Sequence, residues 1–343
     1  MSEVLTGAER KLDADDGGGG ARGAGLVRFL LGKLGGALLS LAMVVVLGFL
    51  LFRMIPGDPV VTMTKGRPVS AEQLAELRER LGVDKPMWQQ FIDYILGLFR
   101  GDLGTSYIFQ RPVADLILER LWPTLLLVGV ATALAIMLGL WFGIRAAWRR
   151  GSGFDKLSTG TALTLWSMPQ FWMGLLLLIA FSGAFPSGGM RYPDTPPDFL
   201  SQSLDVAYHL VLPCLTLTAA LYAQYLLVMR SSLLEEMNSE YLTTARAKGL
   251  RDDLVRRRHA VPNALLPTVT LVFLQFGMVL NGAVAVETVF SWPGLGLLTY
   301  EALSGPDLPV LQSTFLVLAA AVIFMNVLAE LLYRILDPRV RAT

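Results

Sequence analysis

Charged side chains suited to binding another protein gather in one basic stretch, residues 232–262, between two long apolar segments. A connection that only reverses the chain needs a few residues, so a longer one with helical patterning is expected to serve a partner. Ser239 can cap a first short helix, and Glu240 suits the positive end of its dipole. Gly249 can end that helix in the left-handed conformation. The stretch therefore predicts two short helices that meet near a glycine.

The second short helix is expected to begin at Asp252 and Asp253, because acidic side chains favour a helix start. The arginines at 256–258 then fall near its end, where cations are favoured. Together the two helices would present a compact, positively charged surface.

Residues that could carry catalysis or bind a metal are scarce. The chain has two histidines, His209 and His259, and one cysteine, Cys214, in an apolar run. It contains no His-Glu-x-x-His, no Gly-x-Ser-x-Gly and no phosphate-binding Gly-x-x-x-x-Gly-Lys-Ser/Thr sequence. One cysteine excludes an internal disulfide, and no basic patch with interleaved aromatics indicates nucleic acid. We therefore expect no catalytic residue, no metal ligand, no cofactor site and no nucleic-acid partner.

The composition places the chain in a membrane. Of 343 residues, 53% are hydrophobic and 17% charged, and the mean hydropathy is +0.52, which is too apolar for an ordinary soluble enzyme. A bilayer core of roughly 30 Å is crossed by a helix of about 20 apolar residues. The sequence predicts an all-α polytopic membrane protein with six transmembrane helices, at residues 34–54, 122–147, 159–185, 208–229, 263–287 and 310–334.

Two glycine pairs, Gly32/Gly36 and Gly139/Gly143, have the small-xxx-small spacing that lets membrane helices approach closely. Glycine-rich spans also contain such pairs by chance. Both interpretations remain open from the sequence.

Basic residues in the short connections predict the orientation, because they stay on the cytoplasmic side. They follow the predicted second, fourth and sixth spans, whereas the connection after the third contains one, Arg191, and that after the fifth contains none. Both termini and the basic stretch, a loop of residues 231–262, are therefore predicted to face the cytoplasm. Residues 1–25, which are rich in glycine, are predicted to be a disordered cytoplasmic tail that precedes a transmembrane domain of residues 26–341.

Residues 55–121 are predicted to form a helical extracytoplasmic segment between the first two spans. Ser70 with Gln73 resembles a capping box that starts one amphipathic helix, and Pro86 can start a second. We expect these helices to rest on lipid or cap the bundle rather than to bind a specific partner. A separate outer helix is predicted at residues 113–120.

Several sequence features occur in a fixed order: the Gly57-Asp58-Pro59 break, the stretch 241–249 followed by 259–267, residues 282–296, and the tail 336–341. Together they resemble the inner-membrane permeases of binding-protein-dependent ABC importers, in the dipeptide, oligopeptide and nickel group, first-permease-subunit type. The likeness covers about residues 27–341. It implies the type I permease fold of ABC importers, as a multi-pass protein of the bacterial plasma (inner) membrane.

The resemblance implies a cytoplasmic helix that couples the chain to ATPase subunits. The residues expected to form this contact are Glu240, Tyr241, Ala245, Arg246, Ala247, Lys248, Gly249 and Leu250. Where the broader family has Glu-Ala-Ala, this chain has Thr243, Thr244 and Ala245. Basic side chains here could pair with acidic residues of the ATPase, and those at 256–258 could equally contact anionic lipid.

The same resemblance implies that the chain works within a complex. The expected partners are a second homologous permease subunit, two cytoplasmic ABC ATPases that bind ATP and Mg²⁺, and an extracytoplasmic substrate-binding protein. The expected cargo is short peptides, with nickel complexes or glutathione as alternatives. An autonomous secondary transporter is a further alternative, but neither an ion-coupling site nor an internal repeat is found.

Candidates for the translocation path or its outer gate lie in and after the last two spans. They are Gln275, Asn281, Glu287, Phe290, Trp292, Pro293, Gly294 and Asn326. Polar groups at bilayer depth tend to face the bundle interior or water, although each could instead hydrogen-bond a neighbouring helix. The turn after Glu287 is hypothesised to form part of an external gate or to contact the binding protein.

Overall fold

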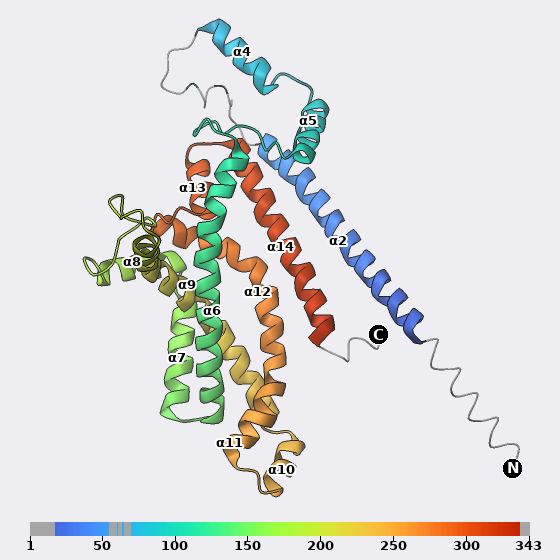
Figure 1. Cartoon of the computed structure of the whole chain (residues 1–343), viewed down its shortest axis with the longest axis vertical. Helices are drawn as coiled ribbons and strands as arrows, with labels where there is room; N and C mark the ends of the chain where they lie inside the picture. The colour runs from blue at the N-terminus through green and yellow to red at the C-terminus, as the bar shows by residue number, and fades with distance from the viewer. Residues whose placement is uncertain (1–17, 55–59, 61–63, 65–69, 337–343) are drawn as a thin grey trace, which may run out of the picture.

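Helices account for the secondary structure in the part of the chain that the computed structural model describes, which is residues 18–54, 60, 64 and 70–336. Within these helices, the side chains of residues 18–29, 80–81, 270, 273–274, 276–282 and 332–336 lie outside the description. The elements in Figure 1 are α2 (Gly18–Met54), α4 (Ala71–Leu81), α5 (Met87–Arg100), α6 (Val113–Trp148), α7 (Gly153–Ser167), α8 (Gln170–Ala180), α9 (Phe199–Glu236), α10 (Glu240–Ala247), α11 (Asp252–Val255), the π-helix η1 (Arg256–Ala260), α12 (Val261–Val289), α13 (Leu295–Ser304) and α14 (Leu308–Leu336). The predicted all-α architecture is confirmed.

The first helix begins earlier than the sequence predicts. Because α2 starts at Gly18, residues 18–25 of the predicted disordered tail are helical. An established helix extends easily, since each added residue contributes one more backbone hydrogen bond. Residues 1–17, the predicted break at 57–59 and the tail from 337 onward lie outside the described residues.

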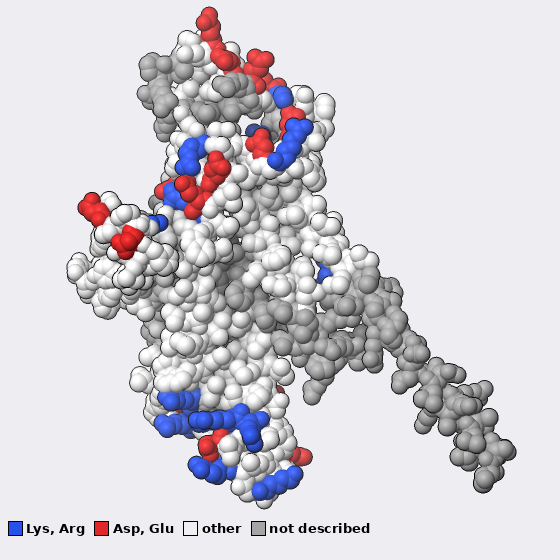
Figure 2. Space-filling view, in the orientation of Figure 1, with Lys and Arg blue, Asp and Glu red and all other residues white. Residues whose placement is uncertain are grey.

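Several helices are long and apolar enough to cross a membrane. Four described helices meet this condition singly, and α7 with α8 meets it as a pair bent by 107°, which brings the number to five. α12 coincides with the predicted fifth span and has 29 residues. Figure 2 shows charged side chains mostly at the two ends of the molecule and a broad, almost uncharged band between them. A hydrocarbon core selects such a band, because unpaired charges are costly within it.

Prolines act differently at different sites. Pro169 precedes α8, and the extended backbone of Met168 before it (φ −85°, ψ 132°) breaks the predicted third span into α7 and α8. Pro123, in contrast, lies inside α6 without ending it. The prediction of a separate outer helix at 113–120 is therefore wrong, because that segment is the first part of α6. Membrane helices tolerate an internal proline where neighbouring groups satisfy the freed backbone.

The centre of the fold is the packing of α6 against α9, with α7 and α12 beside them (Figure 1). Arg230 on α9 binds Asp155 at the start of α7 through two bonds, Nε to Oδ1 at 2.6 Å and Nη2 to Oδ2 at 2.9 Å. α2 and α14 form a further pair, joined by the ion pair of Lys33 and Glu330 at 2.8 Å.

The glycine pair on α6 explains how closely α6 and α9 pack. A Cβ atom at Gly139 would lie 2.5 Å from the Cβ of Tyr225, and one at Gly143 would lie 2.8 Å from the carbonyl oxygen of Leu226. Gly32 and Gly36 differ, because nothing within the described residues comes within 4 Å of a Cβ added there. The close-packing interpretation therefore holds for the α6 pair, and within this chain it does not hold for the α2 pair.

This difference gives a first prediction. Gly143→Val should destabilise the chain by at least the roughly 1–3 kcal/mol typical of overpacking, because the obstructing atom belongs to backbone. Gly36→Val is the matched control in an exposed helix face, and it should leave stability unchanged. Thermal unfolding of the detergent-purified chain measures both. Equal unfolding temperatures for the two variants would contradict the assigned packing.

The predicted amphipathic helices are present beyond the C-terminal end of α2. The capping box is confirmed: the Gln73 amide donates to Ser70 Oγ at 3.2 Å, and the Ser70 amide donates to Gln73 Oε1 at 3.0 Å. Pro86 occupies the position just before α5. The apolar face of α5 is exposed in this chain, with Trp88 at 65% and Phe99 at 87%. Such a face suits lipid or another subunit.

Candidate functional site

The helix predicted to bind a partner is anchored to the bundle by one side. Figure 1 shows α10 and α11 together at one end of the molecule, below α6, α9 and α12. Leu242 and Ala245 of α10 are buried in an apolar cluster with Met229 and Leu233 of α9 and Val255 of α11. Because these contacts are apolar and close, α10 is held rigidly against the helices that it would have to move.

The other side of α10 is exposed. Glu240, Thr243, Thr244, Arg246, Ala247, Lys248 and Gly249 are all exposed, and Leu250 is half-buried. Lys and Arg side chains gather at this end of the molecule in Figure 2. The face is therefore a short, basic helical surface, available to a protein outside the chain.

The predicted glycine end of α10 is confirmed. Gly249 has φ +82°, its amide donates to Arg246 O at 2.9 Å, and the Leu250 amide donates to Ala245 O at 3.3 Å. This pair of bonds is the Schellman motif that ends a helix at a left-handed glycine. The start of α10 differs from the prediction. Ser239 has the extended backbone of a cap but makes no side-chain capping bond.

The second short helix does not end at the arginines. α11 comprises only Asp252–Val255, and the backbone continues as the π-turn η1 into α12. The prediction of a separate second helix ending at 256–258 is therefore wrong. Pro262, near the start of α12, has no amide hydrogen, which favours a change in the hydrogen-bonding pattern at this point.

Some basic side chains of this segment have partners within the chain. Arg246 Nε lies 3.1 Å from Asp252 Oδ1, and Arg251 lies 3.3 Å from Asp253 Oδ1. The Arg256 guanidinium lies 5.7 Å from the centre of the Trp148 ring. These contacts tie α10 to α11 and η1 to α6, and they are exposed enough to exchange for contacts with a partner.

A polar brace that the sequence did not reveal joins α10 to α12. The Tyr241 hydroxyl donates to Glu236 at the end of α9, and His259 O, 3.2 Å away, is a second acceptor for the same hydrogen. It also accepts from Asn263 Nδ2 at 2.9 Å. Burial and the neighbouring Glu236 raise the pKa of Tyr241, so its hydroxyl stays protonated and able to donate. Only the proximity of residues far apart in sequence makes this brace visible.

The predicted outer-gate residues come together at the opposite end of α12. Glu287 is fully buried and accepts from Thr124 Oγ1 at 2.7 Å, from the Gly296 amide at 2.7 Å and from the Leu297 amide at 3.1 Å. The Leu295 amide donates to Thr124 Oγ1 at 2.8 Å. The carboxylate thus caps the start of α13 and fastens it to α6, a favourable place for negative charge.

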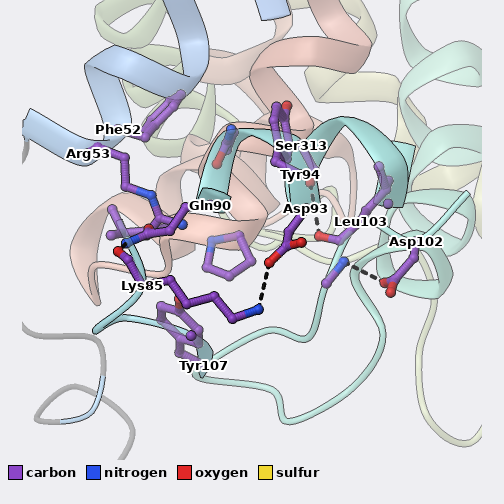
Figure 3. A pocket seen from close by; sticks show the side chains of 16 residues that line it. Phe52, Arg53, Lys85, Gln90, Asp93, Tyr94, Asp102, Leu103, Tyr107 and Ser313 are labelled. Atoms are coloured by element: carbon purple, nitrogen blue, oxygen red, sulfur yellow. Dashed lines mark hydrogen bonds and ion pairs between the residues drawn. The ribbon is translucent and has the colours of Figure 1, made fainter. Parts of the chain in front are cut away.

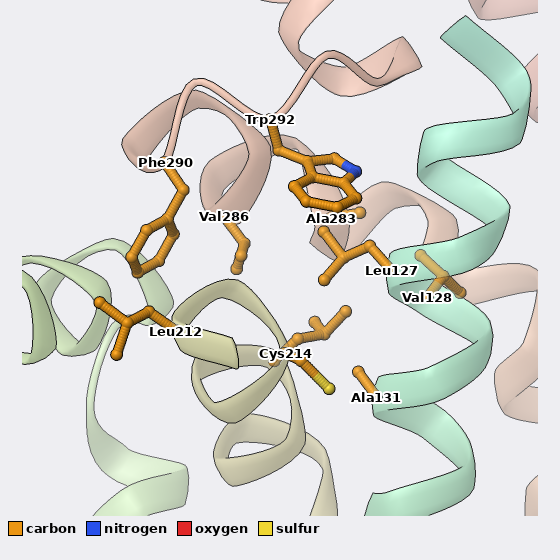
Figure 4. Close-up of a cluster of buried hydrophobic side chains, with 10 residues drawn as sticks. Leu127, Val128, Ala131, Leu212, Cys214, Ala283, Val286, Phe290 and Trp292 are labelled. Atoms are coloured by element: carbon orange, nitrogen blue, oxygen red, sulfur yellow. The ribbon is translucent and has the colours of Figure 1, made fainter. Parts of the chain in front are cut away.

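Trp292 and Phe290 lie in the core rather than on the surface. Figure 4 shows both above Leu127, Val128 and Cys214, which belong to α6 and α9. Trp292 Nε1 donates at 2.9 Å to the carbonyl oxygen of Pro123, in the first third of α6. The turn is therefore a packed junction of α6, α12 and α13 within this chain.

The remaining candidates of the path are separate from this junction. Gln275 Nε2 donates to Gln224 Oε1 on α9, so it makes the interhelical contact considered as an alternative. The side chain of Asn281 lies outside the described residues. Asn326 on α14 is exposed, and Pro293 is half-buried beside the packed turn.

The long apolar helices, with a basic surface at one end and a packed turn at the other, define a multi-pass membrane protein. Comparison with known proteins identifies its class. Residues 135–342 match the family described as "Binding-protein-dependent transport system inner membrane component". Residues 26–128 match "Binding-prot-dependent transport system membrane comp, N-term". The chain belongs to this family of inner-membrane permeases.

Curated relatives extend over nearly the whole chain. The dipeptide transport system permease protein DppB of Escherichia coli (strain K12) is 39% identical over 92% of this chain and 99% of its own length. The di/tripeptide transport system permease protein DppB of Pseudomonas aeruginosa is 38% identical over 92% and 99%. The glutathione transport system permease protein GsiC of Pectobacterium atrosepticum is 36% identical over 92% and 99%.

Family membership settles the general role of the chain. It is a multi-pass inner-membrane protein and a non-catalytic subunit of an ABC transporter, in which ATPases and a binding protein also take part. The family binds no cofactor itself. ATP is therefore bound and hydrolysed by other subunits of the complex.

Proposed function

We propose that this chain is the subunit through which short peptides cross the inner membrane. The support is the 39% identity with a dipeptide permease along almost the full length of both chains. Glutathione, itself a small peptide, is the second candidate cargo, because a glutathione permease is 36% identical over the same share of this chain. Nickel complexes remain a third candidate from the sequence resemblance alone.

In the proposed assembly the chain pairs with a second, homologous permease and lies above two ATPases. Six spans would cross the membrane, with α12 as the fifth and the bent α7–α8 pair as the third. The basic residues at the α10 end favour a cytoplasmic position for that end and for both termini (Figure 2). Residues 1–25 would precede a transmembrane domain of residues 26–341, with 55–121 outside the cell and 231–262 inside.

The proposed role of residues 240–250 is to carry ATPase motion into the membrane. The single supporting observation is that α10 exposes one side while the other is buried against α9 and α11. A force on the exposed side would therefore move the bundle rather than bend a loose loop. ATP-driven closure of the ATPases would supply that force.

The turn after Glu287 is proposed to set the position of the outer gate. Phe290, Trp292 and Gly294 of this turn are buried, so within this chain they would act by fixing α13 against α6 rather than by direct contact with cargo. Replacing Trp292 or Gly294 should therefore impair peptide uptake. Unchanged uptake together with unchanged docking of the binding protein would contradict this role.

The cargo and the need for ATPases can be tested together. Proteoliposomes that contain the chain, the second permease and both ATPases should take up a radiolabelled dipeptide only when ATP and the binding protein are supplied. Proteoliposomes with the chain alone should take up none. Dipeptide uptake by the chain alone would contradict the proposal, and stronger competition by glutathione than by dipeptides would assign the cargo to glutathione.

A further inference from the structure

A cavity lies at the end of the molecule opposite α10, and the proposed function gives it no role. It has a volume of about 340 Å³ and lies between the end of α2, the α4–α5 turn, α5, the loop after α5 and the start of α14 (Figure 3). This volume is at the lower end of the range for small-molecule sites. None of its lining residues belongs to the α10 segment or to the turn after Glu287.

Among the described residues, the charges that line the cavity balance. They are two basic residues, Arg53 and Lys85, and two acidic ones, Asp93 and Asp102. In Figure 3, Arg53 and Asp102 lie at opposite sides, with the Lys85–Asp93 ion pair, 2.6 Å long, between them. The lining therefore suits a ligand that carries both charges and no net charge.

At each of two opposite sides of the cavity, one charged side chain is available to bind a ligand. Arg53 makes no ion pair with any described residue, and its guanidinium lies 5.5 Å from the centre of the Phe49 ring. At the other side, Asp102 Oδ1 accepts from the Gly104 amide at 2.9 Å, which leaves Oδ2 to bind a further donor. An anionic group fits the first side and a cationic group the second.

Two side-chain amides in the wall have unused hydrogen-bonding atoms. Gln90 Nε2 donates to Val83 O at 3.1 Å and to Lys85 O at 2.8 Å, which fixes the amide and leaves Oε1 buried without a partner in the described residues. Gln312 Nε2, on α14, is likewise buried and makes no direct hydrogen bond to a described residue, and the Tyr94 side chain of the cavity wall is its polar neighbour. Because buried polar atoms without a hydrogen-bond partner are destabilising, a bound group that pairs with both amides would be stabilised.

We infer that this cavity binds a short peptide in its zwitterionic form. The peptide's carboxylate would face Arg53, and its ammonium group would face Asp102 or Asp93. A peptide bond offers one acceptor and one donor, which match Gln312 Nε2 and Gln90 Oε1. A phospholipid headgroup also carries both charges, but it contains no amide to match this pair. The inference rests on the proposed peptide cargo and adds a recognition site on the permease itself.

Direct binding tests this site. The assembled complex without its binding protein is titrated with the dipeptide alanyl-alanine by isothermal titration calorimetry. We expect saturable binding that Arg53→Gln and Gln312→Leu each weaken by at least tenfold. Arg100→Gln is the matched control, since Arg100 ends α5 and does not line the cavity. N-acetyl-alanyl-alaninamide, which lacks both terminal charges, should not bind.

The outcomes separate this site from the proposed function. Absent dipeptide binding, equal binding of the capped peptide, or unchanged affinity in correctly assembled Arg53 and Gln312 variants would overturn the inference. Glycerophosphoethanolamine, a soluble phospholipid headgroup, is added as a competitor at up to millimolar concentration. If it displaces the dipeptide at a lower concentration than a second dipeptide does, the inference is overturned and the cavity is assigned to lipid. If the wild-type complex with its binding protein still takes up peptide in these cases, only the inference falls. If it takes up none, the proposed function falls as well.

Discussion

Replacing Gly249 with valine is expected to abolish ATP-driven uptake while leaving membrane insertion intact. The residue has φ +82°, and a Cβ atom there would meet nothing within 4 Å, so the effect is backbone strain rather than a clash. A β-branched residue held in the left-handed region costs about 1–3 kcal/mol, and the chain can relieve that cost by opening the end of α10. Leu250 would then leave its place against the apolar cluster that anchors the helix.

The matched control for this variant is Gly151→Val. Gly151 has φ +80° and equally open surroundings, and it lies in the turn between α6 and α7, outside residues 240–250. Both variants should lose similar stability, but only the one at Gly249 should lose dipeptide uptake and peptide-stimulated ATP hydrolysis in proteoliposomes. Gly249→Asn should retain most activity, because asparagine tolerates the left-handed conformation. Normal uptake by Gly249→Val, or equal losses in both valine variants, would count against a coupling role.

Glu287→Ala is expected to cause the largest loss of stability among variants at the junction of α6, α12 and α13. It removes the acceptor for the buried Thr124 hydroxyl on α6, for the buried Gly296 amide and for the partly buried Leu297 amide at the start of α13. Each donor left unsatisfied costs about 1–3 kcal/mol. A lower unfolding temperature of the detergent-purified chain and loss of uptake in the assembled complex are the expected measurements.

Glu287→Gln distinguishes a structural cap from a role that needs charge. The amide oxygen can still accept from the Gly296 and Leu297 amides, and its NH₂ group can donate to Thr124 Oγ1. Stability should therefore be largely restored relative to alanine, and uptake should return with it. If glutamine restores the unfolding temperature but not uptake, the carboxylate has a further function in transport. If alanine is as stable as the natural chain, the capping role is wrong.

Features that depend on neighbouring residues in sequence could be predicted. The Ser70–Gln73 capping box and the left-handed Gly249 are set by backbone hydrogen bonds within a few residues. Ser239 shows the limit even there, because the cap position is occupied without the capping bond. The apolar segments likewise predicted the approximate positions of the long helices, since a helix that crosses a bilayer needs about 20 apolar residues.

Contacts between distant segments could not be predicted from one sequence. The bond from Thr124 to Glu287 and the brace of Tyr241 with Asn263 depend on how α6, α10, α12 and α13 pack. Prolines illustrate the same limit, because Pro123 stays inside α6 whereas Pro169 separates α7 from α8. Whether a proline ends a helix depends on the neighbours that can satisfy the freed backbone, and a single chain's sequence does not state them.

The burial of Cys214 has a practical consequence. It is the chain's one thiol, and it is only 5% exposed beneath Trp292 and Leu127. A cysteine introduced on the exposed side of α10 would therefore react with a maleimide or nitroxide reagent while Cys214 gives almost no background labelling. Cys214 can then stay in place, so no void is made in the core. Spectroscopic labels can thus follow the motion of that helix during turnover in an otherwise unaltered transporter subunit.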